Sequence, residues 1–433
     1  MIPYGRQDIT QADIDAVVAA LRSAYLTSGP EVSGFEGEFA NLVGAKHAVA
    51  VCNATAALHL AMRLIGVREG DRVITSPNTF LASANCAAYL NAIPDFSDID
   101  PDHHNLDPEV LETNWREDTK AVVAVDYAGQ PCNMPEIARI ARNHGARVIE
   151  DASHAVGSGF SAEGKKWRLG GHPWADLTVF SFHPVKTMTA GEGGMLVTNN
   201  DEYARRARLL RSHGVTRNPE EFVGLGFECP ASNVGSQTEK AIGQTLSATS
   251  LDPRLPPTLP EQGPWVYEMQ ELGYNYRITD FQCALGRSQL RRLASFIQRR
   301  QQIVARYNEA FADLDWLKAP SLDTRHSTSD PSSGFSYQLS DLSLHLYTVQ
   351  INFSSLGMTR TAAMNALRQQ EIGSQVLYIP VHLQPWYRKT YGYHPGKCPV
   401  AEAFYAQALS LPLFSALSDD DVERVVAGVR SLA

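Results

Sequence analysis

Short apolar runs alternate with helical patterns through the first half of the chain. Strand-like runs occupy residues 47–52, 72–75, 93–96, 121–125, 147–150 and 177–180. Helical spacing of apolar residues fills the gaps between them, notably over residues 135–144. Strands that alternate with helices predict a mostly parallel sheet with both faces covered. In such sheets ligands bind beyond the carboxyl ends of the strands.

Two helix starts carry local signals. Thr10, with Asp13 three residues later, forms a capping-box pattern before an apolar helical repeat. Residues 53–57 (Asn-Ala-Thr-Ala-Ala) stand between a strand and a helix that runs through residue 64. Small residues there leave backbone N–H groups free to bind a phosphate. Alanine and threonine are common at helix starts, so this signal is weak by itself.

The second half of the chain predicts a change of domain. Periodicity disappears from about residue 218 to 263, where prolines stand among Ser, Thr, Gln and Gly, so we expect an insertion or lid over residues 219–262. A long helix predicted over residues 296–314 leads to a strand at 347–353 and a helix at 360–370. We therefore expect an N-terminal and large domain over residues 1–295 and a small C-terminal domain over residues 296–433.

Composition narrows the class of protein. The chain has 433 residues, of which 44% are hydrophobic and 20% charged, which is typical of a soluble globular protein. A formal net charge of -9 argues against nucleic-acid binding. The six cysteines form no CxxC pair and the 13 histidines no HExxH motif, so we expect no metal site. We find no leader or long apolar span, and expect a reducing cytoplasm and no membrane association.

Three residues after strand ends suggest chemistry. Lys186 lies in a glycine-rich turn after the 177–180 strand, where a desolvated amine can form a Schiff base. Asp151 directly follows another strand and can pair with a protonated pyridine nitrogen, although aspartate is also a frequent helix N-cap. His154 can stack or hydrogen-bond above a ring, or be a structural histidine. An ordinary loop lysine is the alternative for Lys186.

Five motifs in order resemble those of one family. The chain is similar to the DegT/DnrJ/EryC1/StrS family of pyridoxal-phosphate sugar aminotransferases, from Tyr4 to the C-terminus apart from residues 219–262. The motifs are Asn53-Ala54-Thr55-Ala56-Ala57-Leu58, Glu150-Asp151-Ala152-Ser153-His154-Ala155, Ser181-Phe182-His183-Pro184-Val185-Lys186, Gly191-Glu192-Gly193-Gly194 and Gly273-Tyr274-Asn275-Tyr276-Arg277. The resemblance implies an α/β fold of type I, like aspartate aminotransferase, whose large domain binds the cofactor.

The resemblance also implies roles for single residues. Lys186 holds pyridoxal 5′-phosphate covalently and moves protons, and Asp151 keeps the pyridine nitrogen protonated. The remaining cofactor contacts are the phosphate-binding Thr55, Ala56 and Ser181, the ring-stacking Phe80, and His154, where many relatives carry glutamine. Asn275 reaches the cofactor phosphate of a neighbouring subunit, so the active unit is a homodimer.

Residues 126–130 and 263–270 resemble one branch of the family, the PseC-type enzymes of pseudaminic acid synthesis. These enzymes aminate C4 of UDP-2-acetamido-2,6-dideoxy-β-L-arabino-hexos-4-ulose with L-glutamate as donor. The substrate contacts that this resemblance implies are Tyr4, Thr27, His345 and Tyr347. The alternatives are an aminotransferase for another dTDP-, GDP- or UDP-linked keto-sugar, a dehydratase, against which Lys186 argues, and a non-catalytic regulator that binds pyridoxal phosphate.

Overall fold

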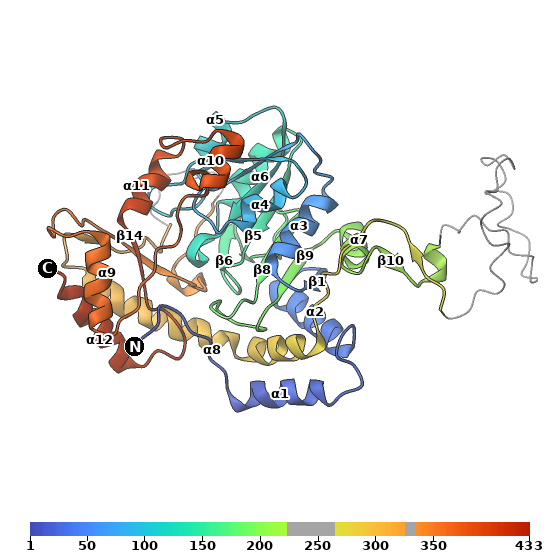
Figure 1. Cartoon of the computed structure of the whole chain (residues 1–433), viewed down its shortest axis with the longest axis horizontal. Helices are drawn as coiled ribbons and strands as arrows, with labels where there is room; N and C mark the ends of the chain where they lie inside the picture. Colours follow the sequence, from blue (N-terminus) through green and yellow to red (C-terminus); the bar gives the residue numbers. More distant parts are fainter. Residues whose placement is uncertain (223–264, 325–333) are drawn as a thin grey trace, which may run out of the picture. The chain divides into compact units, whose positions relative to one another are not determined.

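The computed structural model describes residues 1–222, 265–324 and 334–433 (Figure 1). The predicted insertion lies outside the described residues from 223 onwards. The described chain divides into two compact units, a main unit (Met1–Arg208 with Tyr276–Ala433) and a second unit (Leu209–Asn275). None of the described helices is long and apolar enough to cross a membrane.

The helices predicted after residue 53 and over residues 135–144 and 360–370 are present, and the structure adds several that the sequence analysis did not predict, such as α2. Their bounds are α1 Gln11–Leu21, α2 Pro30–Val43, α3 Ala54–Leu64, α4 Ala82–Ala88, α5 Pro108–Thr113, η1 Tyr127–Gly129, α6 Met134–Asn143, α7 Asp201–Arg211, η2 Pro219–Glu221, α8 Asp280–Phe311, η3 Leu339–Asp341, α9 Arg360–Gln369, η4 Val381–Leu383, α10 Pro385–Tyr391, α11 Pro399–Gln407 and α12 Asp419–Arg430.

The described strands are β1 His47–Val51, β2 Arg72–Thr75, β3 Ile93–Phe96, β4 Thr119–Val125, β5 Arg147–Asp151, β6 Gly159–Ala162, β7 Lys165–Arg168, β8 Leu177–Ser181, β9 Gly194–Thr198, β10 Val215–Thr216, β11 Glu268–Met269, β12 Leu317–Lys318, β13 Tyr347–Ile351 and β14 Ala408–Leu411.

A seven-stranded sheet with the order β1-β9-β8-β5-β4-β2-β3 forms the centre of the main unit. The neighbours from β8 to β3 pair in parallel, whereas β9 runs antiparallel to both β1 and β8. The mostly parallel sheet is thus confirmed. Four of its strands, β2, β4, β5 and β8, end at the same edge, and Asp151 and Lys186 lie at or after the ends of β5 and β8.

Helix α8 links the part of the main unit that contains the seven-stranded sheet to the C-terminal part. Its 32 residues begin at a capping box formed by Thr279 and Gln282, and α1 and α2 pack along it (Figure 1). We expected a new helix to begin near residue 296, but the helix continues unbroken from Asp280, because no proline or glycine pair interrupts its repeat. The predicted domain boundary at residue 295 therefore falls inside α8, and the division at that residue stays a prediction.

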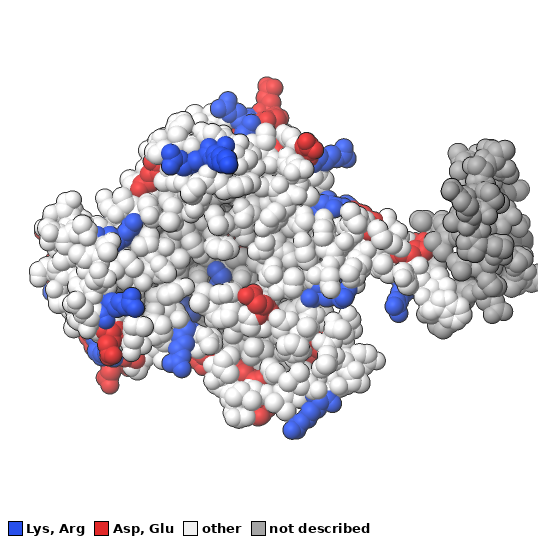
Figure 2. Space-filling view, in the orientation of Figure 1, with Lys and Arg blue, Asp and Glu red and all other residues white. Residues whose placement is uncertain are grey.

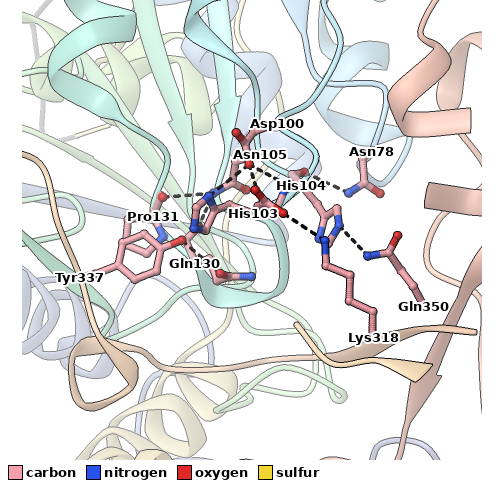
Figure 3. A network of polar contacts seen from close by, with 11 residues as sticks. Asn78, Asp100, His103, His104, Asn105, Gln130, Pro131, Lys318, Tyr337 and Gln350 are labelled. Atoms are coloured by element: carbon pink, nitrogen blue, oxygen red, sulfur yellow. Dashed lines mark hydrogen bonds and ion pairs between the residues drawn. The ribbon is translucent and has the colours of Figure 1, made fainter. Parts of the chain in front are cut away.

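A three-stranded antiparallel sheet, β12-β13-β14, lies in the C-terminal part of the main unit. The turn Asp100–Asn105 joins it to the large sheet (Figure 3). On one side of this turn, Asn105 Nδ2 donates to the carbonyl of Gln130 at 2.9 Å, just beyond β4. On the other, Asp102 pairs with Lys318 of β12 at 3.0 Å. These contacts tie the C-terminal part to the strand ends of the large sheet.

The second unit contains the two-stranded ribbon of β10 and β11, and a bridge between Ser212 and Asn275. On the face of the main unit drawn in Figure 2, basic and acidic side chains are interspersed in small groups rather than separated by sign. An aromatic cluster fixes the large sheet to α2, with the ring centroids of Phe39 in α2 and Phe180 in β8 5.0 Å apart.

Candidate active site

A cavity of about 470 Å³ lies at the carboxyl ends of β4, β5 and β8 in the main unit. The residues that line it come from these strand ends, from the starts of α3 and α4, and from the C-terminal part: Tyr4, Asn53, Ala54, Thr55, Leu58, Thr79, Phe80, Ala82, Ser83, Val125, Asp151, Ser153, His154, Ser181, His183, Val185, Lys186, Glu192, His345, Leu377 and Tyr378. This is the edge at which a parallel sheet is expected to bind its ligand.

Lys186 is carried by the loop that connects β8 to β9. Phe182 closes this loop at its base, because its N–H donates to Gly193 O at 2.9 Å and its carbonyl accepts from Ala190 N at 3.0 Å. Gly191 adopts a φ of +80°, a left-handed conformation that suits glycine. The hydrogen bonds hold Lys186 at the cavity wall, so its position is defined by backbone rather than by the loose tip of a surface loop.

The amine of Lys186 is unusually acidic. Loss of hydration lowers its pKa from the usual value to about 8, while the negative charge of Asp151 opposes that shift. A lysine with such a pKa is partly neutral near physiological pH, which a nucleophilic or proton-transferring amine requires. The lysine and the acid therefore act on each other within one cavity.

Asp151 is buried, with 4% of its surface exposed, yet it lines the cavity. Ser83 Oγ donates to its Oδ2 at 2.7 Å, and the backbone N–H of Ser153 donates to its Oδ1 at 3.1 Å. Each carboxylate oxygen thus has a described donor and further acceptor capacity. A ring N–H entering the cavity is a chemically suitable partner for that remaining capacity.

A turn around Ala128 places two histidines beside each other. Ala128 has a φ of +59°; its N–H donates to His154 Nδ1 at 3.3 Å, and its carbonyl accepts from the backbone N–H of His345 at 2.9 Å. The two imidazole centroids lie 4.6 Å apart. Burial, with the charge of Lys186 adding to it, lowers the pKa of both histidines well below the usual range, so both are neutral at pH 7.

The segment that carries His345 is held from behind by Arg300, a fully buried residue of α8. Its guanidinium donates to the carbonyls of Leu344 and His345, both at 3.3 Å, and of Leu413 at 2.9 Å. His345 Nδ1 is buried and has no hydrogen-bond partner in the described residues. This nitrogen can therefore form a hydrogen bond with a ligand.

The phosphate-binding residues predicted in the turn before α3 differ in their position relative to the cavity. The N-cap Asn53 accepts from the N–H of Ala56 at 2.8 Å, and Ala56 does not line the cavity, whereas Thr55 and Ser181 do. A Cβ on Gly194 would lie 2.6 Å from Ala54 N, so only glycine lets β9 pack this closely behind the turn. Ala56 N–H is therefore already engaged by the cap, which leaves Thr55 as the cavity-facing residue of this pair.

The other predicted residues separate into two groups. Tyr4 and Phe80 line the cavity, and the Phe80 ring, 56% exposed, lies 6.0 Å from that of Tyr378. Thr27 and Tyr347 do not line it. Thr27 is exposed and bridges Thr279, and Tyr347 is buried in β13 with its hydroxyl donating to Asn308 Oδ1 at 2.7 Å. Asn275 belongs to the second unit.

Sequence reasoning missed several lining residues, among them Ser83, Glu192 and Tyr378. The hydrogen-bond directions around Tyr378 can be worked out. His154 Nδ1 accepts from Ala128, so the neutral ring carries its proton on Nε2, which donates to Tyr378 Oη at 3.1 Å. The phenolic proton of Tyr378 is therefore available to a ligand in the cavity.

Comparison with known proteins identifies the family of this chain. The model of the DegT/DnrJ/EryC1/StrS aminotransferase family matches residues 7–251 and 252–430. This chain belongs to that family. Its members depend on pyridoxal phosphate, and Lys186 facing Asp151 across a cavity of suitable chemistry fits that cofactor. The chain is accordingly a sugar aminotransferase of the type I α/β fold.

Individual relatives cover the whole chain. The spore coat polysaccharide biosynthesis protein SpsC of Bacillus subtilis is 38% identical over 434 residues, covering 100% of this chain and 97% of the relative. Among solved structures, Helicobacter pylori PseC, an aminotransferase of pseudoaminic acid biosynthesis, is 26% identical with a TM-score of 0.79, covering 100% of this chain and 98% of its own. The putative sugar aminotransferase Spr1654 of Streptococcus pneumoniae, in its pyridoxamine phosphate form, is 27% identical with a TM-score of 0.80, covering 100% and 99%.

Proposed function

We propose that this protein transfers the amino group of L-glutamate to C4 of a UDP-2-acetamido-2,6-dideoxy-4-keto-hexose, as in pseudaminic acid biosynthesis. The observation that carries the aminotransferase chemistry is Lys186, with a lowered pKa, facing Asp151 in one cavity. Support for the sugar comes from the likeness to PseC and from the Asp126–Gln130 segment, whose Ala128 holds both cavity histidines.

The residues of this chain have defined tasks in that reaction. Pyridoxal phosphate, when bound, supplies an electron sink and carries the amino group between donor and sugar. Lys186 Nζ removes a proton from Cα of glutamate, and in the second half-reaction delivers one to C4 of the sugar. Asp151 accepts the ring N–H, Thr55 and Ser181 bind the phosphate, and Phe80 covers the ring. His345 Nδ1 and the Tyr378 hydroxyl are the polar groups offered to the substrate.

The sugar is tested with a panel of nucleotide keto-sugars. Purified protein loaded with pyridoxal phosphate is mixed with glutamate, and the conversion of its absorbance to the pyridoxamine form is recorded. Each keto-sugar is then added and the aminated product is identified by mass spectrometry. We expect the UDP-N-acetyl-4-keto-sugar to give the highest kcat/KM. A higher value for a dTDP- or GDP-linked sugar, with the glutamate step intact, would refute the sugar and keep the aminotransferase.

A second candidate is an aminotransferase for another nucleotide keto-sugar. It is favoured by the 38% identity to a protein named for spore coat polysaccharide biosynthesis, which exceeds the identity to PseC. The same panel separates the two. A regulator that binds the cofactor without turnover would fail the glutamate step itself. Residence in a reducing cytoplasm stays a prediction from the cysteine pattern.

We further propose a homodimer with shared sites, in which Asn275 of each chain binds the cofactor phosphate of the other. Mixing two inactive variants tests this. Lys186→Ala and Asn275→Ala mutants, co-expressed, can form a heterodimer in which one site keeps both residues. We expect recovery of up to about a quarter of wild-type activity from random pairing. Sedimentation as a monomer, or no recovery in a proven heterodimer, would contradict the shared site.

A further inference from the structure

A chain of buried hydroxyl groups ends at the acid of the active site. Thr79 Oγ1 and Ser83 Oγ lie 2.7 Å apart, and Ser83 Oγ lies 2.7 Å from Asp151 Oδ2. All three residues are nearly inaccessible, with exposures of 2%, 1% and 4%. Thr79 and Ser83 come from the segment that follows β2 and begins α4, and Asp151 ends β5, so two separate parts of the sheet edge meet in this chain.

The direction of the chain follows from donor and acceptor capacities. An ionised carboxylate only accepts hydrogen bonds, so the Ser83 proton points to Asp151. The Ser83 oxygen then accepts from Thr79, whose hydroxyl is the donor of that pair. Ser83 therefore has one fixed orientation, with its proton on the carboxylate.

Asp151 has several other titratable neighbours. It lies near the buried Asp126 carboxyl and the Cys86 thiol, whose pKa values are both raised, chiefly by burial. The charge of Asp151 adds to the shift of Cys86, and the charges of Glu150 and then Asp151 add to that of Asp126. Lys186 faces it from the loop and Tyr378 from the C-terminal part.

We propose that Ser83, oriented by Thr79, is a positioning residue that keeps the Asp151 carboxylate aimed at the ring nitrogen of the cofactor. The Ser83 hydroxyl occupies one lone pair of Oδ2 and the Ser153 N–H occupies Oδ1, which fixes the plane of the carboxylate. Loss of the Ser83 donor weakens the pairing of Asp151 with the ring N–H. The proposal rests on the cofactor assignment and on Asp151 as the nitrogen partner, and not on the sugar or the amino donor.

The test compares two ligands that differ only at the ring nitrogen. Apoprotein is titrated with pyridoxal phosphate and with its 1-deaza analogue, which carries C–H in place of the nitrogen, and dissociation constants are measured by fluorescence. We expect Ser83→Ala to weaken pyridoxal phosphate binding about tenfold, as for one hydrogen bond to a charged group, and analogue binding less than twofold. Asp151→Asn should show the same selectivity with a larger loss.

Matched variants separate positioning from packing. Ser83→Thr keeps the hydroxyl and should restore selective binding. Ser410→Ala removes another fully buried serine, bonded to Thr348 at 2.8 Å in the small sheet, and should leave both affinities unchanged. As a second readout, the pH at which the absorbance of the loaded protein changes should shift in Ser83→Ala but not in Ser410→Ala.

Three results would overturn the proposal. Equal losses for both ligands in Ser83→Ala would make Ser83 a structural residue only. Unchanged affinities in Ser83→Ala would mean that it does not influence the site. Absence of selectivity in Asp151→Asn would mean that the hydroxyl chain ends at an acid that does not touch the nitrogen. Each readout is binding or absorbance, so none depends on the sugar panel.

Discussion

Two adjacent carboxylates at the end of β5 face opposite sides of the same sheet. Glu150 is fully buried, and its oxygens accept from His172 Nε2 at 2.7 Å, Thr178 Oγ1 at 2.9 Å and Gly170 N at 3.2 Å. Asp151 points the other way, since successive side chains of a strand alternate between faces. It borders the cavity that Lys186 also lines.

The two faces differ in how many hydrogen-bond donors the protein itself supplies to the carboxylate. Glu150 is fully buried and accepts from three protein donors, so its hydrogen bonds stabilise the sheet. Asp151 has two protein donors and an open side, so part of its hydrogen-bonding capacity is reserved for a bound molecule. Substitutions on the two faces should therefore change different measured quantities.

The largest effect is expected from Lys186→Ala on the cavity face. Without the amine there is no group to hold the cofactor covalently or to move the substrate proton, so turnover should fall by at least about 10³-fold. Steady-state kinetics measures the loss, and circular dichroism should show an unchanged fold. Lys186→Arg keeps the positive charge but cannot deprotonate near pH 7, and should be as inactive. Wild-type turnover in either variant would show that the lysine is misassigned.

The comparison is sharpest between Asp151→Asn and Glu150→Gln. The first should lower kcat about 10–100-fold, because it removes a charge-assisted hydrogen bond to the ring. It should leave the denaturation midpoint nearly unchanged. The second replaces one accepting oxygen by an amide donor, which then opposes either the His172 N–H or the Thr178 hydroxyl, and should lower the free energy of unfolding by about 1–3 kcal/mol.

Kinetics and urea denaturation, run on both variants, decide the matter. The contrast fails if Glu150→Gln lowers kcat as much as Asp151→Asn while its denaturation midpoint is unchanged. In that case the two faces of β5 would both serve the reaction, and the buried cluster of Glu150, His172 and Thr178 would be part of the active site.

A moderate effect of pH is expected on cofactor loading. Lys186 has a pKa of about 8, so its amine is mostly protonated at pH 7 and mostly neutral at pH 9. Only the neutral amine attacks an aldehyde, so the rate at which apoprotein takes up pyridoxal phosphate should rise about tenfold over that range. Asp151→Asn removes the charge that raises this pKa and should move the midpoint to lower pH. A rate independent of pH between 7 and 9 would be inconsistent with this amine.

The smallest effect separates two tyrosines. Tyr378→Phe removes one donor from the cavity and should lower kcat/KM about 3–10-fold. Tyr347→Phe breaks a buried hydrogen bond to Asn308 and should lower the denaturation midpoint while kcat/KM stays within about twofold. If Tyr347→Phe had the larger effect on kcat/KM, the substrate contact predicted from the family resemblance would be right despite its buried position.

Local sequence determined most of the elements and the chemistry of the site. Alternating apolar runs predicted β2 and β3 residue by residue, and the Thr10 and Asp13 pattern predicted the start of α1. Lys186 and Asp151 could be singled out because Asp151 ends β5 and Lys186 lies in the loop after β8, and the parallel strands of one sheet end at the same edge. The unbroken α8 was missed because its second half looked like an independent helix.

Tertiary structure decided what sequence spacing cannot encode. Ser83 meets Asp151 across 68 residues and Tyr378 meets His154 across 224, and no periodicity links such pairs. The same holds for Tyr347, whose hydroxyl donates to Asn308 and which does not line the cavity. The position of a lysine and an acid near strand ends can be read from the sequence alone, because a strand is recognised from the hydrophobic pattern of neighbouring residues. Which hydroxyls and rings complete the cavity was decided by packing, since that depends on how distant segments meet.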